Sequence, residues 1–216
     1  METEEAKIFR GELFAPGAPE LKAIKLRAHK LSRQYNALEE DDAENRGRIL
    51  AALLRACGEG TFLQGPVFFH YGVHTSLGRR NFFNYDTVIQ DDAPVTVGDD
   101  NNFGPRLTIV TPLHPLLPGE RRFLRDENGE RRHLCYARPV KIGNDCWFGA
   151  GVTVCPGVTI GDNCVIGAGA VVTRDIPADS LAAGVPCKVI RRLTAADSLR
   201  HRPELLGRYR VEEDYA

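Results

Sequence analysis

Large apolar residues recur at every sixth position through much of the C-terminal half of the chain. This series comprises Ile142, Phe148, Val154, Ile160, Ile166 and Val172. Glycine is the next residue in four of these six cases. A spacing of six matches neither the 3.6-residue turn of an α-helix nor the two-residue alternation of a half-buried strand. It predicts a solenoid of hexapeptide repeats, in which each hexapeptide forms a short strand and a turn.

The repeat also predicts the geometry of one coil. Three hexapeptides form a triangular coil, so residues 18 apart should stack at the strand spacing of about 4.8 Å. The large apolar residue fills a narrow core, while glycine and Asn or Asp tolerate the turns. This register places Cys146 directly beneath Cys164. We expect two packed reduced thiols, with a disulfide or a metal-binding pair as the alternatives.

The repeat is looser upstream, where the same pattern of an apolar residue followed by glycine returns at a different interval. Gly78 and Gly98 are 20 residues apart instead of 18, which predicts a bulge or a small insertion. We therefore expect a parallel β-helix over residues 59–192. An N-terminal helical segment should cover residues 1–58, and residues 193–216 should form a tail of loop or short helix.

Residues 19–57 follow helical spacing instead of the hexapeptide repeat. Apolar positions run at helical intervals from Leu21 to Tyr35, and again from Ile49 to Cys57, with Gly58 as a natural stop. An uncovered end of a solenoid would expose its apolar core to water. We therefore expect two helices that cap the first coil.

Residues 111–139 interrupt the repeat with a stretch that is rich in proline and charge. Such a loop inside a regular solenoid is a candidate functional element, and a tolerated surface insertion is the alternative. His114 lies between two nearby prolines that restrict the backbone, and imidazole is a common general base. An inert loop histidine is the other possibility. Glu120, Glu127 or a backbone carbonyl could orient the ring.

Composition narrows the range of partners. The formal net charge is -1, so whole-protein attraction to nucleic acid or to an anionic membrane is not expected. No apolar run approaches the roughly 20 residues that a membrane span needs. The charged N-terminus lacks the apolar core of a signal peptide, and six cysteines in such a chain are expected to be reduced. We expect a cytoplasmic protein.

An anionic ligand would therefore have to meet a local basic cluster. Such a cluster occurs where the repeat ends, at Arg174, Lys188, Arg191 and Arg192. Arginine and lysine suit phosphate groups, although a solvated surface patch is the simpler alternative. His70, His74 and His114 lack the close pair that a zinc site between coils would need, so we expect no metal.

Taken with the hexapeptides, the segments TPLHP, NYDTVIQDD and AAGVPCKVIR resemble the maltose/galactoside O-acetyltransferases, in the nodulation-protein-L branch of the hexapeptide acyltransferases. The resemblance covers nearly the whole chain. It implies a left-handed parallel β-helix and a homotrimer with active sites between neighbouring subunits. The implied reaction is transfer of acetyl from acetyl-CoA to a sugar hydroxyl, typically at C6.

The resemblance also implies roles for individual positions. His114 falls on the catalytic base, and Asn84 would stabilise the oxyanion. His70, Asn84 and Asp92 fall on the acceptor side. The expected acetyl-CoA contacts are Ala150, Ala168, Thr173, Arg174, Lys188 and Arg191. Transfer should be direct, so Cys155 and Cys187 are not expected to act as nucleophiles.

Three positions depart from the family pattern on the acceptor side. Pro16 replaces an acidic contact, His70 a serine-like residue and Phe82 a tyrosine-like residue, which leaves the identity of the sugar open. Two other functions remain possible. One is an acetyltransferase for serine, a xenobiotic antibiotic or an amino sugar. The other is a non-catalytic β-helix scaffold.

Overall fold

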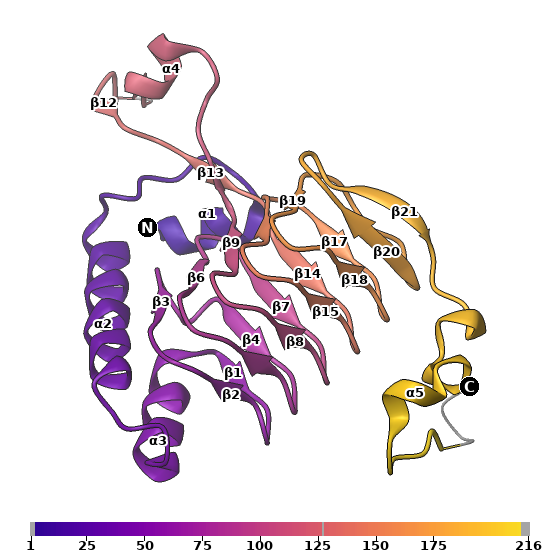
Figure 1. Cartoon of the computed structure of the whole chain (residues 1–216). Helices are drawn as coiled ribbons and strands as arrows, with labels where there is room; N and C mark the ends of the chain where they lie inside the picture. Colours follow the sequence, from indigo (N-terminus) through magenta and orange to yellow (C-terminus); the bar gives the residue numbers. More distant parts are fainter. Residues whose placement is uncertain (1–2, 127, 213–216) are drawn as a thin grey trace.

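The computed structural model describes residues 3–126 and 128–212. Three helices precede a column of short strands, which leads away from the helices towards the C-terminal tail (Figure 1). The helices are α1 (Glu4–Arg10), α2 (Pro19–Asn36) and α3 (Ala43–Leu53). The predicted parallel β-helix with a small helical segment at its N-terminal end is confirmed.

The strands stack into three sheets, which are parallel except that β21 runs antiparallel to β20. The first sheet contains β1 (Ala56–Cys57), β4 (Thr75–Leu77), β7 (Val95–Val97), β14 (Val140–Ile142) and β17 (Thr159–Ile160). The second contains β2 (Phe62–Leu63), β5 (Phe82–Phe83), β8 (Asn102–Phe103), β15 (Trp147–Phe148), β18 (Val165–Ile166), β20 (Ser180–Ala183) and β21 (Lys188–Arg192). The third contains β3 (Val67–Phe69), β6 (Thr87–Gln90), β9 (Thr108–Val110), β16 (Thr153–Val154) and β19 (Val171–Val172).

Coils of two lengths make up this column. In the N-terminal coils a residue pairs with the residue 20 positions later, as Leu77 does with Val97. In the C-terminal coils the interval is 18, as between Ile142 and Ile160. Equivalent core positions are six residues apart around two of the three corners in both kinds of coil. The extra residues therefore lie at the remaining corner, between the third and the first sheet. The insertion predicted between Gly78 and Gly98 is therefore a feature of each N-terminal coil and not a single bulge.

Side chains from successive coils stack inside the column. The rings of Phe83, Phe103 and Phe148 follow one another with centroids 4.3 and 4.8 Å apart. The backbone N–H of Cys164 donates to Sγ of Cys146 at 3.4 Å, so the predicted stacking of these cysteines is confirmed. All six cysteines are free thiols.

The expected end of the second helix is wrong. The helical pattern was expected to run to Cys57 and to stop at Gly58, but α3 ends at Leu53. Ala56–Cys57 form β1 and pair with β4, three residues before the expected start of the solenoid at residue 59. Gly58 is needed for packing between coils, because a Cβ there would lie 2.5 Å from the carbonyl carbon of Gly78. The last residues of the helical pattern are therefore the first apolar and glycine positions of the repeat.

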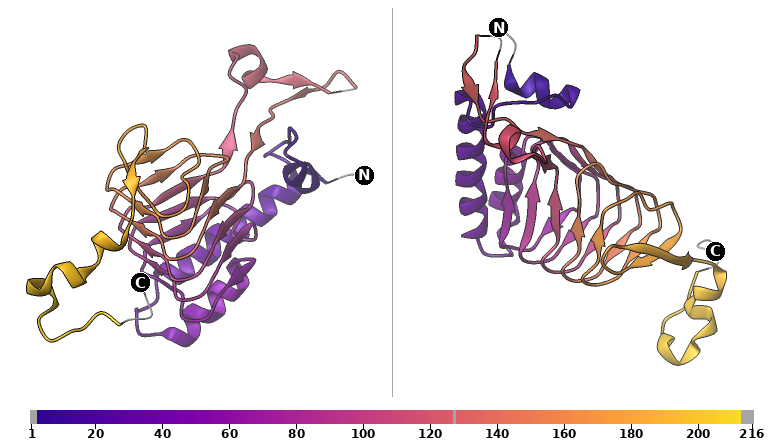
Figure 2. Two further views of the ribbon diagram at one scale, coloured as in Figure 1. Left: turned by 90° about the vertical axis from the view of Figure 1, so that its right-hand side faces the viewer. Right: turned by 90° about the horizontal axis from the view of Figure 1, so that it is seen from above.

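Residues 111–139 form an arm that projects from the solenoid (Figure 2). Its base is an antiparallel pair, β10 (Pro112–Leu113) with β13 (Tyr136–Ala137). Further out lie α4 (Pro118–Arg122) and a second pair, β11 (Leu124–Arg125) with β12 (Arg131–Arg132). We call these residues the arm.

The tail beyond β21 contains two short 3₁₀ helices, η1 (Ala195–Asp197) and η2 (Leu199–His201), and the helix α5 (Pro203–Leu206). This agrees with the expected loop or short helix up to residue 212, and residues 213–216 lie outside the described part. Within the described residues, none of the helices combines the length and the apolar character that crossing a membrane requires.

Candidate active site

His114 lies on the arm, directly after β10, and its side chain is exposed. Its ring centroid is 5.9 Å from that of His133, on the returning side of the arm. Among the described residues, neither Glu120 nor a backbone carbonyl forms a hydrogen bond with the ring, and Glu127 lies outside that set. The arm therefore presents His114 to solvent in a single chain, and among the described residues no hydrogen-bond partner orients its ring.

Asn84 follows β5 in the second sheet. Its backbone N–H donates to the carbonyl oxygen of Phe103 at 3.1 Å, within the hydrogen-bonding ladder between coils. Its side-chain Oδ1 accepts from the backbone N–H of Tyr85 at 2.8 Å. Nδ2 has no hydrogen-bond acceptor among the described residues. A donor for an oxyanion at Asn84 must therefore be the side-chain amide, which Tyr85 holds in a fixed orientation.

Asp92 lies at the corner where the N-terminal coils carry their extra residues. Its Oδ1 is 3.8 Å from Nε2 of His70, while its buried Oδ2 has no hydrogen-bond partner in the described structure. Burial and the neighbouring Asp91 raise the pKa of Asp92 to about 6. Burial, with a smaller effect of Lys25, lowers the pKa of His70 to about 4. At neutral pH an ionised carboxyl thus lies beside a neutral imidazole.

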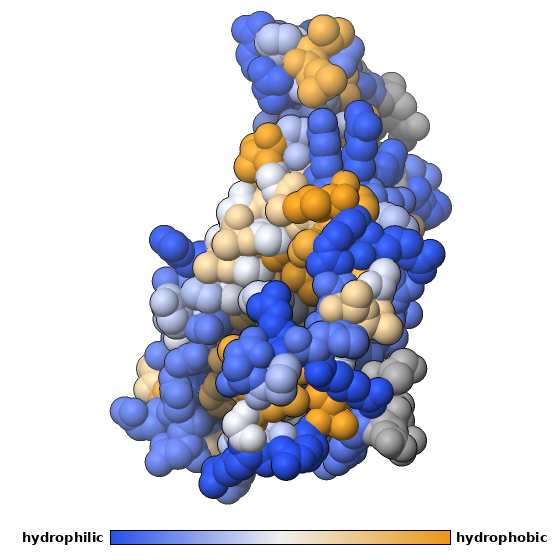
Figure 3. All heavy atoms as spheres, turned by 45° about the vertical axis from the view of Figure 1, so that its right-hand side comes forward, coloured by the Kyte–Doolittle hydropathy of each residue, from blue (hydrophilic) through white to orange (hydrophobic). Residues whose placement is uncertain are grey.

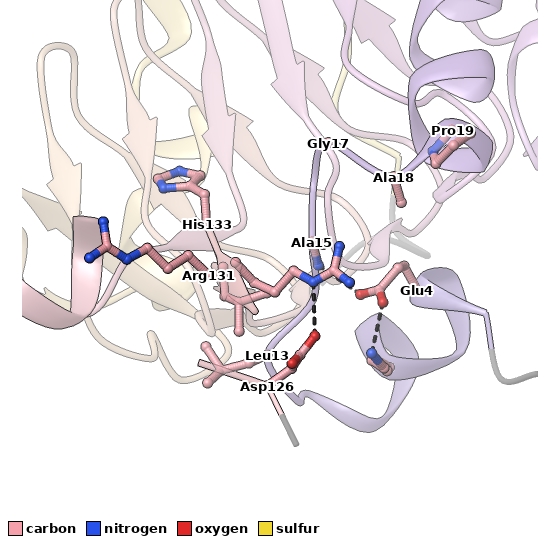
Figure 4. Close-up of a pocket in the computed structure, with 12 residues that line it drawn as sticks. Glu4, Leu13, Ala15, Gly17, Ala18, Pro19, Asp126, Arg131 and His133 are labelled. Atoms are coloured by element: carbon pink, nitrogen blue, oxygen red, sulfur yellow. Dashed lines mark hydrogen bonds and ion pairs between the residues drawn. The ribbon is translucent and has the colours of Figure 1, made fainter. Parts of the chain in front are cut away.

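A cavity of about 970 Å³ separates the N-terminal segment from the arm (Figure 4). Its lining residues are Glu4, Lys7, Leu13, Ala15, Gly17, Ala18, Pro19, Asp126, Arg131, Arg132, His133 and Leu134. Lys7 pairs with Glu4 at 2.7 Å, and Arg132 pairs with Asp126 at 3.0 Å. Because His133 also lies beside His114, the cavity adjoins the candidate base.

Ala150 and Ala168 occupy equivalent turns of two adjacent C-terminal coils. Gly169 N–H donates to the carbonyl oxygen of Ala150 at 2.8 Å, which joins the two turns. Neither the Ala150 nor the Ala168 backbone N–H donates a hydrogen bond within the described residues. A Cβ at Gly149 would lie 2.5 Å from the Ala168 nitrogen, so the coils pack closely here. The two alanines thus offer unpaired backbone donors at turns where their own side chains are small.

Of the basic residues of the C-terminal coils, Arg174 and Lys188 lie where β19 meets the start of β21, whereas Arg191 and Arg192 lie at the far end of β21. Cys187 N–H donates to the carbonyl oxygen of Val171 at 2.8 Å. This bond places Lys188, the first residue of β21, beside β19, the strand that directly precedes Thr173 and Arg174. Lys188 and Arg174 are exposed and have no carboxylate partner among the described residues. The face of the molecule seen in Figure 3 exposes apolar side chains between hydrophilic ones.

Arg191 and Arg192 differ from Arg174 and Lys188, because each pairs with a carboxylate, and that of Arg192 is Asp179 at 3.0 Å. Arg191 makes the more extensive contact. Its guanidinium donates to both carboxylate oxygens of Asp197, at 2.7 and 2.5 Å. The same contact lowers the pKa of Asp197 to about 2. Arg191 was expected to bind a phosphate of CoA, but the carboxylate of Asp197 competes for the same guanidinium. Arg174 and Lys188 have no such competitor among the described residues.

Several residues around the site were missed by sequence reasoning. Asp91 and His74 are buried next to Asp92, and Glu5 reaches His74 from α1. The spacing of 20 residues between coils could have pointed to this corner, but not to a partner about 70 positions away. No group of three metal-ligating side chains converges among the described residues.

Comparison with known proteins agrees with this arrangement. The maltose acetyltransferase hexapeptide capping motif matches residues 7–58, and the bacterial transferase hexapeptide family (six repeats) matches residues 139–174. Galactoside O-acetyltransferase of Escherichia coli K12 is 38% identical over 191 residues, which cover 88% of this chain and 90% of that protein. Nodulation protein L of Rhizobium meliloti is 38% identical over 187 residues, 87% of this chain and 97% of that protein.

A solved structure of a galactoside acetyltransferase in complex with coenzyme A has a similar fold. The two chains superpose with a TM-score of 0.83 at 35% identity, over 99% of this chain and 100% of that one. The similarity therefore includes the helices, the solenoid and the arm. The chain belongs to the maltose/galactoside O-acetyltransferase family, and it is an acetyltransferase built on hexapeptide repeats.

Proposed function

We propose that the protein transfers acetyl from acetyl-CoA to a hydroxyl group of a sugar, at C6. The observation that carries this proposal is the buried carboxyl of Asp92, whose Oδ2 has no hydrogen-bond partner in the described structure. A buried polar oxygen without a partner is costly, and a hydroxyl-rich ligand would satisfy it. The neutral ring of His70 beside it can bind a second hydroxyl. The galactoside acetyltransferases among the relatives support a sugar as the acceptor.

The proposed chemistry is a single direct transfer. Nε2 or Nδ1 of His114 accepts the proton of the sugar hydroxyl while the oxygen attacks the thioester carbonyl. The Nδ2 amide of Asn84 donates to the oxyanion that develops. The carbon–sulfur bond then breaks, and the departing thiolate of CoA takes the proton from His114. The acetyl group never resides on the protein.

Neither candidate cysteine suits a covalent alternative. Burial raises the pKa of Cys187 and that of Cys155, so both favour the unreactive thiol. A thiolate nucleophile usually depends on a nearby cation or base that lowers its pKa. This supports the direct mechanism.

The C-terminal coils would hold acetyl-CoA. The unpaired backbone donors of Ala150 and Ala168 suit the amide oxygens of the pantetheine arm, which can approach closely because the side chains of both residues are small. Thr173, Arg174 and Lys188 would face the phosphates. Arg191 would join them only after exchanging Asp197 for a phosphate.

We further propose that the active site forms between copies of the chain in a homotrimer. Within the described part of one chain, no hydrogen bond or ring contact joins His114 to Asn84, His70 or Asp92. A neighbouring copy that receives the arm would bring the base to the acceptor. Measuring the mass in solution by light scattering tests this arrangement.

The decisive experiment measures thiol release from acetyl-CoA with maltose, glucose, galactosides, glucosamine, serine and chloramphenicol as acceptors. We expect release with sugars and its loss in His114→Ala. Release with serine or chloramphenicol alone would assign a different acceptor to the same fold. A protein that binds no CoA would instead be a scaffold.

A further inference from the structure

The acceptor residue Asp92 depends on its backbone for position. Its Oδ2 has no hydrogen-bond partner, and its Oδ1 is 3.8 Å from His70, which is beyond hydrogen-bond distance. The remaining polar groups that act on this carboxyl, the side chain of Gln90 and the backbone of Asp92, belong to the corner at residues 90–93, so the corner sets where the carboxyl points. What holds that corner therefore also sets the position of the carboxyl.

His74 holds this corner from the preceding coil. Its Nδ1 lies 3.0 Å from the carbonyl oxygen of Asp91 and 3.0 Å from that of Asp92. The carboxylate of Asp91 accepts from Tyr71 N–H and from the hydroxyl of Thr75, both at 2.8 Å. His74 thus contacts the carbonyl groups of the two peptide bonds that flank the Cα atom of Asp92.

The other side of the His74 ring faces the N-terminal helix. Nε2 lies 3.1 Å from Oε1 of Glu5, and the side chain of His74 is 1% exposed. The Nδ1 side of the ring thus faces two carbonyl oxygens of the corner, and the Nε2 side faces the carboxylate of Glu5. The edge of Phe9 covers the same ring, with the centroids 5.1 Å apart.

Helix α1 has only seven residues, too few to be stable on its own. Two of its anchors lie at the acceptor corner: Ile8, which is buried in a cluster with Tyr71, Ala93 and Cys135, and the contact from Glu5 to His74. Ala93 directly follows Asp92, so α1 packs against the same corner that His74 holds. The helix and the acceptor corner therefore form one packed unit.

We propose that Glu5 and His74 are positioning residues that make acceptor binding depend on the docking of α1. Glu5 fixes the His74 ring, the ring fixes the backbone of residues 91 and 92, and this backbone aims the carboxyl of Asp92 at the acceptor. The inference rests on the proposed role of Asp92 in acceptor binding. Neither positioning residue needs to touch the sugar.

The test compares Glu5→Ala with Glu12→Ala, a matched control whose carboxylate pairs with Arg10 on the exposed side of the same segment. We expect Glu5→Ala to raise KM for the acceptor about tenfold, the effect of losing one charged hydrogen bond. The KM for acetyl-CoA and kcat should stay within about twofold. In an Asp92→Asn background, Glu5→Ala should add little, because both changes act on one group.

A purely structural role would change these quantities differently. Equal loss for both substrates, or effects that multiply in the Asp92→Asn background, would overturn the proposal. His74→Gln serves as the second variant, and it should also raise the acceptor KM selectively if it folds.

Amide hydrogen exchange gives a readout that does not require turnover. Glu5→Ala should speed exchange in peptides covering residues 3–11 and also residues 88–95, whereas Glu12→Ala should leave residues 88–95 unchanged. Faster exchange in residues 3–11 alone would refute the coupling. If the wild-type protein acetylates no sugar, the proposed function fails, and the exchange measurement still decides whether α1 holds the corner.

Discussion

The N-terminal and C-terminal coils of this solenoid share one core but differ in one corner. In the N-terminal coils, the corner after the third sheet carries two extra residues, and His70, His74, Asp91 and Asp92 lie there. In the C-terminal coils the hexapeptide is regular, and Ala150 and Ala168 leave backbone N–H groups unpaired. The arm leaves from the same corner as the extra residues, between β9 and β14.

The difference shows two ways in which a repeat can supply a site. Extra residues at a corner add polar side chains that can bind and orient an acceptor without disturbing the stacked core. A strictly regular repeat offers small residues and backbone donors to a long, amide-rich cofactor. The proposed division between an acceptor half and a CoA half follows this division of geometry.

The largest effect on activity is expected from the candidate base on the arm. His114→Ala should lower kcat by roughly 10²–10⁴-fold, because a general base usually contributes this much. Thiol release at saturating acetyl-CoA measures it, with His201→Ala in the tail as a matched control. A variant that retains near wild-type turnover would remove His114 from the mechanism.

The acceptor half is tested next at Asn84. Replacement by alanine removes the Nδ2 donor and should lower kcat by about 10²–10³-fold, the usual cost of losing one oxyanion donor. Asn84→Asp keeps the shape but loses the donor, so it should be equally impaired. An active Asn84→Asp enzyme would contradict the assignment, and circular dichroism controls for folding.

In the CoA half, substitutions of the basic residues should weaken binding of the CoA phosphates. Arg174→Gln and Lys188→Gln should each weaken binding of CoA about tenfold while leaving a pantetheine fragment unaffected, since each removes a charged contact. Arg191→Gln should have a smaller effect, because Asp197 already pairs with that guanidinium. Calorimetric titration measures all three, with Arg48→Gln on α3 as the control. Equal weakening of CoA and pantetheine would show that this cluster does not bind phosphate.

Binding of the acceptor should depend on pH, whereas binding of acetyl-CoA should not. The pKa of Asp92 is raised to about 6, so the carboxyl is ionised above that pH and protonated below it. Acceptor affinity should therefore fall as the pH drops through 6, by up to about tenfold per unit, while KM for acetyl-CoA stays flat. The dependence of KM on pH in wild type and in Asp92→Asn measures this. An unchanged slope in the variant would assign the titration to another group.

The stacked coils should be less tolerant of added volume than the arm. Gly149→Ala would place Cβ 2.5 Å from the nitrogen of Ala168, and we expect it to lower the free energy of unfolding by about 1–3 kcal/mol. Gly119→Ala on the arm meets no atom within 4 Å and serves as the control. Thermal unfolding compares the two variants, and equal stability would show that the coils can separate.

The repeat by itself determined most of the fold, including the stacking of Cys146 beneath Cys164. A period of six is a local property, because every hexapeptide carries its own core residue and turn. The same pattern showed that residues 78–98 differ from later coils. The prediction of the helix end failed at Cys57 and Gly58, because these positions fit both helical and hexapeptide spacing. Only the pairing of β1 with β4 assigns them to the solenoid.

The candidate site residues were predicted from the sequence through resemblance, but their chemical states depend on tertiary contacts. The raised pKa of Asp92 requires burial and the adjacent Asp91, and the pairing of Arg191 with Asp197 requires the fold of the tail. The contact between Glu5 and His74 joins residues 69 positions apart. Such distant pairs leave no periodic signal, because they depend on how α1 packs against a corner of the solenoid. The sequence therefore determined the coil and the candidate residues, and the tertiary structure decided which charges and donors remain available to a ligand.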